Sequence, residues 1–404
     1  MVRYFPIKFA RTLRQIYINL VGNQCLDAQF PAVDIVISGI YIISCSYFQV
    51  KLNRVIALLS VFINGYGNIG RRLGTALAAD KEIHLIGVGK YSANEKTLEA
   101  LENGLDIYVP TANVNDFEKK GYRIKGTIQE AVGQSDLIID ATMEGGGFNN
   151  KKHLYEPMQK PAIFQGGEDR HGDRSVAEMI HNSRVNYEKA SDQTYVIQGS
   201  CNVSGMGRIM QPLIEQYSGQ IKRYDVTLVR RWADLEDSKD VNDSIEWDKL
   251  PHHQEDVKDF IPAANLYVEA YKVPSRMMHL HQMLIRFRRK APNKEKIIEI
   301  FRNEFGVAIL NKVKGTAELR NKAIQLGFPH GDTHMVHIHE DIMRVQDDTL
   351  KVSYSDDQTG MVIPENHLLM QSMMFKRNRT EAIKNTENLF QINKKKKMLE
   401  KEFK

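Results

Sequence analysis

Val61-Phe62-Ile63-Asn64-Gly65-Tyr66-Gly67-Asn68-Ile69-Gly70-Arg71-Arg72 is the stretch that decides the fold. A strand-like run, Val61 to Asn64, passes through three glycines spaced as G-x-G-x-x-G into a helix-like run, Arg71 to Ala79. In this context the first glycine permits a tight turn, the second lets backbone approach a pyrophosphate, and the third allows close helix–strand packing. The stretch therefore predicts a dinucleotide site built from Gly65, Gly67, Asn68, Ile69 and Gly70, although a turn without a ligand would show the same pattern.

Strand-like and helix-like runs alternate after this motif, through Ile83 to Val88 and Glu95 to Asn103, as far as Leu137 to Ala141. Such alternation is typical of a parallel sheet with helices on both faces. From about Tyr224 the runs have period two, as in Tyr224 to Arg230 and Met277 to Phe287. The sequence therefore predicts an α/β Rossmann-type dinucleotide-binding domain and an α+β catalytic domain with a mostly antiparallel sheet.

These patterns divide the chain into five expected parts. They are an N-terminal extension, either disordered or the product of a start site placed too early (1–60), the dinucleotide-binding domain (61–199), the catalytic domain (200–361), a C-terminal helix that returns to the first domain (362–392) and a basic tail (393–404). The helix-like pattern of the fourth part extends from Glu365 to Phe390.

Composition narrows the class of protein. The 404 residues are 42% hydrophobic and 26% charged, as in ordinary globular proteins. The longest apolar stretch, Ile35 to Phe48, is about half the length that a bilayer-spanning helix needs, so we expect no membrane span. Three cysteines, Cys25, Cys45 and Cys201, do not form a disulfide framework, which favours a cytoplasmic location.

The formal charge of +5 is concentrated at the two ends of the chain. A nucleic-acid-binding protein would present its positive charge as a patch on the folded body, which is mildly acidic here. The run Lys394-Lys395-Lys396-Lys397 also lacks the interleaved aromatic residues of single-strand binding platforms. The charge pattern therefore argues against nucleic acid as a partner, and solvated tails are the better interpretation.

Cys201 is the only cysteine after residue 60, and it lies in Ser200-Cys201-Asn202 between a strand-like run, Thr194 to Ile197, and a helix-like run, Ile209 to Tyr217. The positive end of a helix dipole favours a thiolate, which is the nucleophilic form of cysteine. This position predicts a catalytic nucleophile. The alternative is a small buried hydrophobic side chain.

Lys90 occupies the end of the second strand, where an NAD-selective site presents Asp or Glu to the ribose hydroxyls. A cation there would attract the 2′-phosphate of NADP, with assistance from Arg71 and Arg72. NADP is therefore favoured and NAD stays open. An exposed lysine that touches nothing is the alternative.

Seven segments, in this order and spacing, resemble the archaeal-type (class II) glyceraldehyde-3-phosphate dehydrogenases. The segments are Ile63-Asn64-Gly65-Tyr66-Gly67-Asn68-Ile69-Gly70, Gln165-Gly166-Gly167-Glu168, Ser200-Cys201-Asn202, Leu228-Val229-Arg230-Arg231, His252-His253, Met278-His279-Leu280-His281 and Val362-Ile363-Pro364-Glu365-Asn366. The resemblance runs from about residue 61 to about residue 390. It implies a homotetramer that oxidises glyceraldehyde 3-phosphate with NAD(P) and inorganic phosphate, through a thioester on Cys201, to 1,3-bisphosphoglycerate.

The resemblance also implies roles for further residues. A base in the His279–His281 pair would take the hydroxyl proton, and the spacing from Cys201 favours His281; a core or interface histidine is the alternative. His252, His253, Ser200, Asn202 and Arg231 would bind substrate, while Arg230, Gly167 and Gln358 would lie at the cofactor. Because side chains alternate along a strand, only one of Arg230 and Arg231 is expected to face the site.

Two features depart from this picture or compete with it. Val203 and Ser204 stand where the family usually has two threonines, which removes one possible phosphate donor. His334, His337 and His339 with Glu340 suggest a metal site, but their spacing matches no defined one and the family needs none, so no metal is expected. Aspartate-semialdehyde dehydrogenase, which the histidine pattern and Gln-Gly-Gly-Glu disfavour, and a non-catalytic nucleotide- or RNA-binding relative are the alternative functions.

Overall fold

The strand that begins the glycine motif lies inside a parallel sheet in the computed structural model, which describes residues 58–165, 167–233 and 240–404. The strand order is β4-β3-β2-β1-β5-β6-β8-β7, and every pair is parallel. Phe62 and Ile63 of β1 are fully buried, because helices cover both faces of such a sheet. The strands are β1 (Leu59–Asn64), β2 (Ile83–Gly89), β3 (Ile107–Val109), β4 (Gly126–Thr127), β5 (Leu137–Asp140), β6 (Ala162–Gln165), β7 (Met179–His181) and β8 (Tyr195–Gln198).

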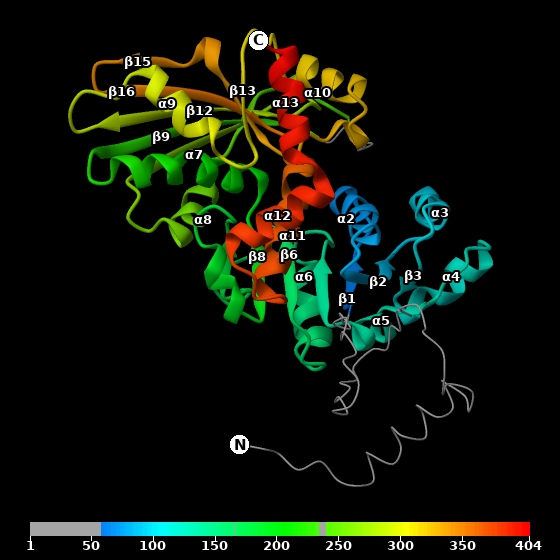
Figure 1. Ribbon diagram of the computed structural model, residues 1–404. Helices are drawn as coiled ribbons and strands as arrows, with labels where there is room; N and C mark the ends of the chain where they lie inside the picture. The colour runs from blue at the N-terminus through cyan, green and yellow to red at the C-terminus, as the bar shows by residue number, and fades with distance from the viewer. Residues whose placement is uncertain (1–57, 166, 234–239) are drawn as a thin grey trace, which may run out of the picture. The chain divides into compact units, whose positions relative to one another are not determined.

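Helices follow the strands of this sheet in the predicted alternation (Figure 1). One helix shows clearly why its sequence folds locally: Thr127 and Glu130 form a capping box at the start of α5, which satisfies two backbone donors. The α-helices are α2 (Asn68–Ala78), α3 (Glu95–Glu102), α4 (Val114–Lys119), α5 (Ile128–Gln134) and α6 (Gly146–Asn150). The short helical turns are η1 (Thr111–Asn113), η2 (Lys151–Tyr155) and η3 (Tyr187–Asp192).

The second sheet is mixed, with the order β10-β11-β9-β12-β16-β14-β13 and β15 added on β16. β12 is antiparallel to both neighbours, whereas β11 is parallel to β9 and β13 is parallel to β14. The expected antiparallel character therefore holds for the centre of the sheet, whereas the pairs β11–β9 and β13–β14 make the sheet mixed. The strands are β9 (Ile221–Arg231), β10 (Glu246–Trp247), β11 (Leu266–Val273), β12 (His279–Phe287), β13 (Val307–Leu310), β14 (Val336–His339), β15 (Arg344–Gln346) and β16 (Thr349–Asp356).

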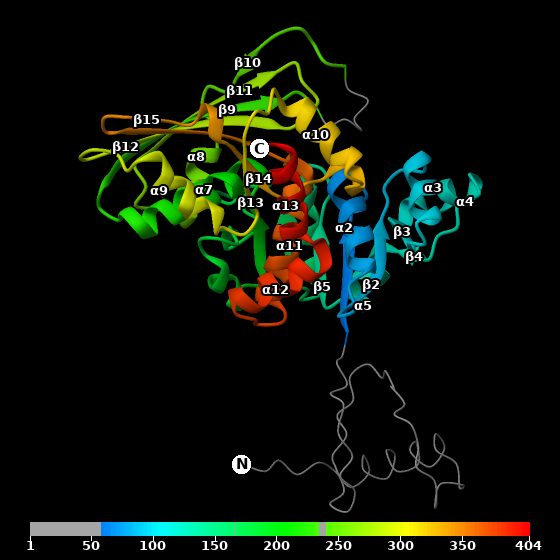
Figure 2. The same ribbon diagram turned by 45° about the horizontal axis from the view of Figure 1, so that its top comes forward.

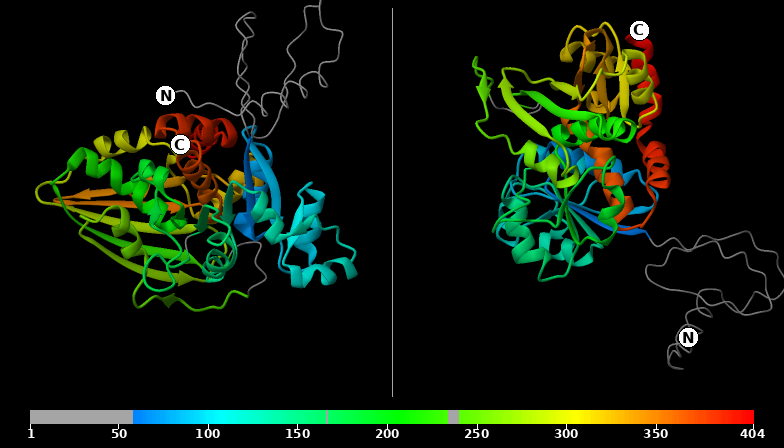
Figure 3. Two further views of the ribbon diagram at one scale, coloured as in Figure 1. Left: turned by 90° about the horizontal axis from the view of Figure 1, so that it is seen from below. Right: turned by 90° about the vertical axis from the view of Figure 1, so that its left-hand side faces the viewer.

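The helix α7 (Cys201–Tyr217) packs on this second sheet, where it contacts β9 and β16 (Figures 1 and 3). Met206, Ile209, Met210 and Leu213 of α7 are fully buried in one core cluster with residues of both sheets. The other helices of this part are α8 (His253–Phe260), α9 (Lys294–Arg302) and α10 (Thr316–Gln325), with the turns η4 (Pro329–Gly331) and η5 (Glu340–Ile342).

The predicted C-terminal helix is two helices, α11 (Gln358–Met373) and α12 (Arg379–Phe390). α11 packs against α2, α7 and β8, so it touches elements of both sheets (Figure 2). A buried ion pair joins α11 to α7, with Nη2 of Arg208 2.5 Å from Oε1 of Glu365. Every residue of α11 is buried, which explains why its sequence lacks an amphipathic pattern.

The lysine-rich C-terminus is not a solvated tail. It forms α13 (Ile392–Glu402), which packs along β13, and Ile392 and Leu399 are fully buried. Lys395 and Lys396 are also buried, and their ammonium groups donate to backbone carbonyls. The prediction of a solvated tail was wrong, because Ile392, Leu399 and Phe403 form an apolar stripe that packs against the fold. This packing buries two of the lysines as well.

Both sheets belong to the compact unit Leu58–Lys404. The expected N-terminal extension over residues 1–60 lies outside the described residues up to residue 57, and β1 already begins at Leu59. Within the described ranges, no helix is both long enough and apolar enough to cross a bilayer.

Candidate active site

The glycine turn joins β1 to α2 in a geometry that requires two of its glycines. Gly65 has a φ of +117°, and a Cβ there would lie 2.5 Å from the carbonyl oxygen of Ala141. A Cβ on Gly70 would lie 2.0 Å from the carbonyl oxygen of Gly65. Gly67 differs, because a Cβ there would meet no atom within 4 Å. The turn is thus sterically closed at its ends and open at Gly67, where α2 begins.

Cys201 is the first residue of α7 and is partly exposed. Ser200 caps this helix, because its hydroxyl accepts the amide N–H of Val203 at 3.4 Å. The thiol therefore lies at the positive end of a helix of 17 residues, which favours a thiolate. The side chain of Val203 is fully buried in the core and does not line the cavity in which Cys201 lies. A hydroxyl at this position would therefore not reach that cavity.

One cavity of about 280 Å³ brings the predicted nucleophile and the predicted nucleotide turn together. Its walls come from both sheets and from the starts of α2, α7 and α11. Eight of the predicted site residues line it: Gly67, Asn68, Ile69, Ser200, Cys201, Arg231, His279 and Gln358. Ala141, Gln165, Thr359 and Val362 also line it, and sequence reasoning did not assign a site role to any of these four.

The two histidines of β12 share one face of the strand, as predicted from their spacing. Their rings stack with centroids 5.5 Å apart. His279 lies on the cavity wall, and its Nδ1 accepts the backbone N–H of Arg231 at 3.1 Å. Burial, with the charges of His281 and Arg231, holds the pKa of His279 well below its usual value, so its ring is neutral near pH 7.

His281 is fully buried beside His279. Its Nε2 lies 2.9 Å from Oδ1 of Asn202 and 3.1 Å from Oδ2 of Asp356. Asp356 ends β16 and is the cross-strand partner of His279. Sequence reasoning missed this carboxylate, because only strand pairing brings it to the histidines.

Asn202 links these groups to the predicted substrate histidines. Its Nδ2 lies 3.0 Å from Nε2 of His253, which begins α8 and is buried. Burial and the charge of His252 lower the pKa of His253 well below its usual value. His252 stacks on His253 but is more exposed, and a hydrogen bond to Asp256 raises its pKa. Neither ring lines the cavity itself.

The two predicted arginines separate as strand alternation requires. Arg231 lines the cavity with Cys201, whereas Arg230 forms an ion pair with Asp248. Arg72 was expected to assist at the cofactor, but its guanidinium is held by Asp332, with Nε 2.6 Å from Oδ2.

Lys90 and Gly167 lie outside the cavity that contains the thiol. Lys90 follows β2, is buried, and donates to Oδ1 of Asn94 at 3.1 Å. Burial, with the charge of Lys96, lowers its pKa to about 8. Lys90 is therefore not the exposed surface lysine of the alternative interpretation. Gly167 has a φ of +135° with open space at its Cβ, and its neighbour Gly166 lies outside the described residues.

The histidines near residue 337 make hydrogen bonds within the fold. Nδ1 of His337 lies 3.2 Å from the carbonyl of Ser355, and Nε2 of His339 lies 3.1 Å from its hydroxyl. His334 instead contacts the ammonium of Lys395. Within the described ranges, the one group of three donors that could hold a metal ion is Cys201, His279 and Asp356, whose ligand atoms lie within 4.8 Å of one another.

Comparison with known proteins gives relatives over most of the chain. A glyceraldehyde-3-phosphate dehydrogenase from Sulfolobus acidocaldarius is 32% identical over 344 residues, which covers 83% of this chain and 98% of the relative. Enzymes of the same name from Pyrobaculum arsenaticum and Methanosarcina mazei are 31% and 33% identical, over 83% and 78% of this chain and 98% and 93% of theirs. No family model matches the chain.

Proposed function

The chain belongs to the archaeal-type glyceraldehyde-3-phosphate dehydrogenase family, and we propose that it oxidises glyceraldehyde 3-phosphate with NADP or NAD and inorganic phosphate through a thioester on Cys201. The single observation that carries this proposal is the shared cavity. It joins a thiol at a helix start to Gly67 of the glycine turn, with Arg231 and His279 in the same walls.

The residues at the turn fit a dinucleotide. Open space at Gly67 lets the backbone approach a pyrophosphate, and the N-terminus of α2, which begins directly after it, carries the positive end of the helix dipole. Gln358 and Thr359, at the start of α11, would lie near the nicotinamide because they share the cavity with Cys201. The nicotinamide, when bound, accepts the hydride from the substrate. A buried Lys90 at the end of β2 supports a preference for NADP.

In the proposed mechanism the Cys201 thiolate attacks the aldehyde carbon and forms a thiohemiacetal. Arg231 binds a phosphate group, which a guanidinium can hold with two hydrogen bonds. The His279–His281 pair takes the hydroxyl proton as the hydride leaves carbon. Inorganic phosphate then attacks the thioester carbon, releases 1,3-bisphosphoglycerate and restores the thiolate. Asn202 keeps the imidazoles in place throughout.

The test is cofactor reduction with glyceraldehyde 3-phosphate, measured for NADP and NAD separately, with and without phosphate. Wild type and Cys201→Ser are compared, because serine keeps the size of the side chain and removes the thiolate. We expect phosphate-dependent activity in the wild type and loss of activity in the variant. Activity that does not depend on phosphate would show that water, and not phosphate, attacks the thioester. Activity in Cys201→Ser would overturn the thioester intermediate.

Assembly into a homotetramer is also part of the proposal, and it rests on the family resemblance alone. Light scattering coupled to gel filtration measures it directly. A mass of about one chain, 46.3 kDa, would contradict it.

A further inference from the structure

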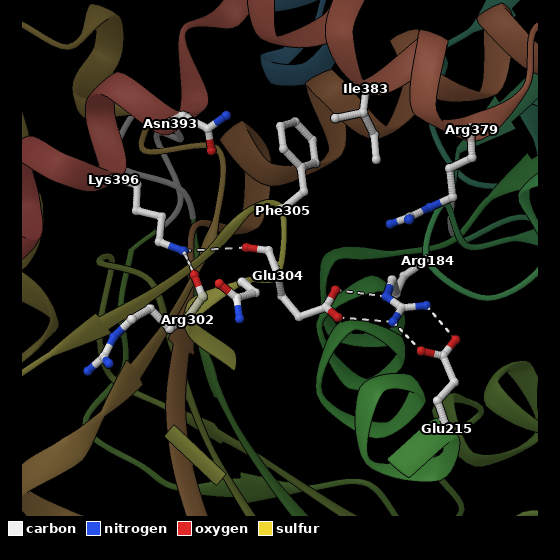
Figure 4. A pocket seen from close by; sticks show the side chains of 10 residues that line it. Arg184, Glu215, Arg302, Glu304, Phe305, Arg379, Ile383, Asn393 and Lys396 are labelled. Carbon is white, nitrogen blue, oxygen red and sulfur yellow. Dashed lines mark hydrogen bonds and ion pairs between the residues drawn. The ribbon is translucent and has the colours of Figure 1, made fainter. Parts of the chain in front are cut away.

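A second cavity, of about 710 Å³, lies away from the candidate active site and shares no residue with its walls (Figure 4). It lies where the start of α12, the helix α13, the end of α9 and the segment around Arg184 come together. Its size is in the range of pockets that hold small molecules. Nothing in the proposed oxidation uses it.

The walls of this cavity carry more positive than negative charge. The cations are Arg184, Arg302, Arg379 and Lys396, and the carboxylates are Glu215 and Glu304. Both carboxylates bind Arg184, whose Nη2 lies 2.5 Å from Oε2 of Glu215 and whose Nε lies 2.7 Å from Oε2 of Glu304. Arg184 and its two carboxylates together carry a formal charge of −1, so the other three cations leave the walls with an excess of two positive charges.

None of these three cations forms an ion pair with a carboxylate in the described part of the chain. Nε of Arg379 donates to the carbonyl of Ser183 at 2.7 Å, and Nζ of Lys396 donates to the carbonyl of Arg302 at 2.7 Å. Lys396 is 9% exposed. Burial lowers the pKa of both Arg379 and Lys396, which reflects a cost of keeping these charges without an anion.

Arg184, Arg379 and Lys396 are held in place before any ligand arrives. Figure 4 shows Lys396 and Arg302 on one side of the cavity and Arg379 and Arg184 on the other. The Ser183 carbonyl that holds Arg379 belongs to a residue whose hydroxyl donates to Glu365 at 2.8 Å. Side chains fixed in this way lose little conformational freedom on binding.

We propose that this cavity binds a small anion that carries two or more phosphate groups. Separated cations on opposite walls suit a ligand with separated negative groups, and the planar guanidinium of Arg379 suits phosphate oxygens. A single carboxylate would leave one wall uncompensated. Phe305 and Ile383 add a small apolar surface beside the cations.

The test uses inorganic pyrophosphate as the probe, titrated calorimetrically into the full chain at low salt. We expect Arg379→Gln to weaken binding about tenfold or more, because a charge-assisted hydrogen bond contributes roughly that factor. Lys384→Gln, an exposed cation on the same helix outside the cavity, is the matched control and should leave affinity unchanged. Arg231→Gln separates the two sites, since pyrophosphate held by the active site would be lost only in that variant.

Equal affinity in wild type and Arg379→Gln would overturn the proposal, as would loss of binding in Arg231→Gln alone. Arg302→Glu is the second variant, because this exposed side chain at the rim can be reversed in charge without disturbing the core. It should weaken pyrophosphate binding even if Arg379→Gln fails to fold. Inorganic sulfate at matched ionic strength should bind more weakly than pyrophosphate, and equal binding would reduce the cavity to a general anion site and contradict the proposal.

Discussion

Asn202 is the residue through which the parts of the candidate active site touch. Its amide contacts His253 of α8 on one side and His281 of β12 on the other, and it follows Cys201 directly in the chain. One planar side chain therefore fixes the orientation of two buried imidazoles relative to the nucleophile.

The two histidines of β12 are expected to have different roles, because different nitrogens are occupied. In a neutral His279 ring, Nδ1 accepts the Arg231 amide, so the proton is on Nε2 and the ring can only donate there. In His281, Nε2 faces Asn202 Oδ1 and Asp356 Oδ2, which leaves a lone pair on Nδ1. Nδ1 of His281 has no hydrogen-bond partner among the described residues. We therefore propose His281, through this nitrogen, as the base.

We predict that His281→Asn lowers kcat/KM about 10²- to 10⁴-fold, as loss of a general base does. His279→Asn should cost about 10²- to 10³-fold, as loss of a donor to a developing oxyanion does. Steady-state rates of both variants at saturating cofactor measure this. A larger loss in His279→Asn than in His281→Asn would assign the base to His279.

Lys90 gives a residue-scale prediction for the cofactor. If its ammonium binds the 2′-phosphate, Lys90→Gln should lower kcat/KM for NADP by roughly 10- to 100-fold, the effect of one lost hydrogen bond to a charged group, and leave NAD nearly unchanged. Lys81→Gln, at an exposed position before β2, is the control. Equal losses with both cofactors would show that the buried lysine only supports the fold.

At the scale of elements, the sequence located the strands better than the starts of helices. Hydrophobic runs identified β1, β2 and β5 nearly to the residue. α7 was predicted from Ile209 but begins at Cys201, because two glycines and several polar residues hide its first turns. Packing explains the glycine at position 207, because a Cβ on Gly207 would lie 2.2 Å from the side-chain nitrogen of Asn182. Such a neighbour is invisible in the local sequence.

The residues of the candidate site also divide into those that local sequence indicates and those that only long-range contacts bring into place. The glycine turn and Cys201 were predicted from local patterns, and the histidine pair was predicted from the family resemblance. Asp356 was not, since a carboxylate at a strand end has no pattern of its own. Its meaning comes from the pairing of β16 with β12, which is a long-range contact.

β14 gives an element-scale prediction about pH. Burial lowers the pKa of His337 to about 3 and that of His339 to about 4, whereas an unfolded histidine titrates near 6.5. Below pH 6.5 the unfolded chain binds protons that the folded chain refuses. The contribution of these two histidines to the free energy of unfolding is therefore fully present above pH 6.5 and is lost as the pH falls towards 4. At pH 5 the loss is about 2 kcal/mol per histidine.

Urea unfolding at pH 7 and pH 5 measures this loss. His339→Gln keeps a hydrogen-bonding side chain without the titration, so its loss between the two pH values should be about 2 kcal/mol smaller than in the wild type. His84→Gln, on an exposed position of β2, should lose as much as the wild type. An unchanged loss in His339→Gln would contradict the prediction.

At the scale of the whole molecule, the C-terminal helices join the two sheets. α11 contacts α2 of the first sheet and α7 of the second, and α13 continues to β13. The order of the sheets along the chain was predictable from hydrophobic periodicity. The packing of the lysine-rich end was not predictable in this way. Four consecutive lysines dominate the composition of this segment, whereas three spaced apolar residues decide where the helix packs.

The last prediction follows from that packing. Removing residues 392–404 deletes the buried side chains of Ile392, Leu399 and Phe403, each of which stabilises the fold by roughly 1.5 to 3 kcal/mol. It also removes the carbonyl of Phe403, which accepts the Asn311 amide at 2.9 Å. Because a whole domain is stable by only about 5 to 15 kcal/mol, the shortened chain should lose most of its cooperative thermal unfolding transition. Lys394→Gln with Lys397→Gln removes two exposed charges of α13 and should leave Tm nearly unchanged, since surface substitutions cost little. A shortened chain with the wild-type Tm would show that α13 is an appendage, as the charge pattern alone had suggested.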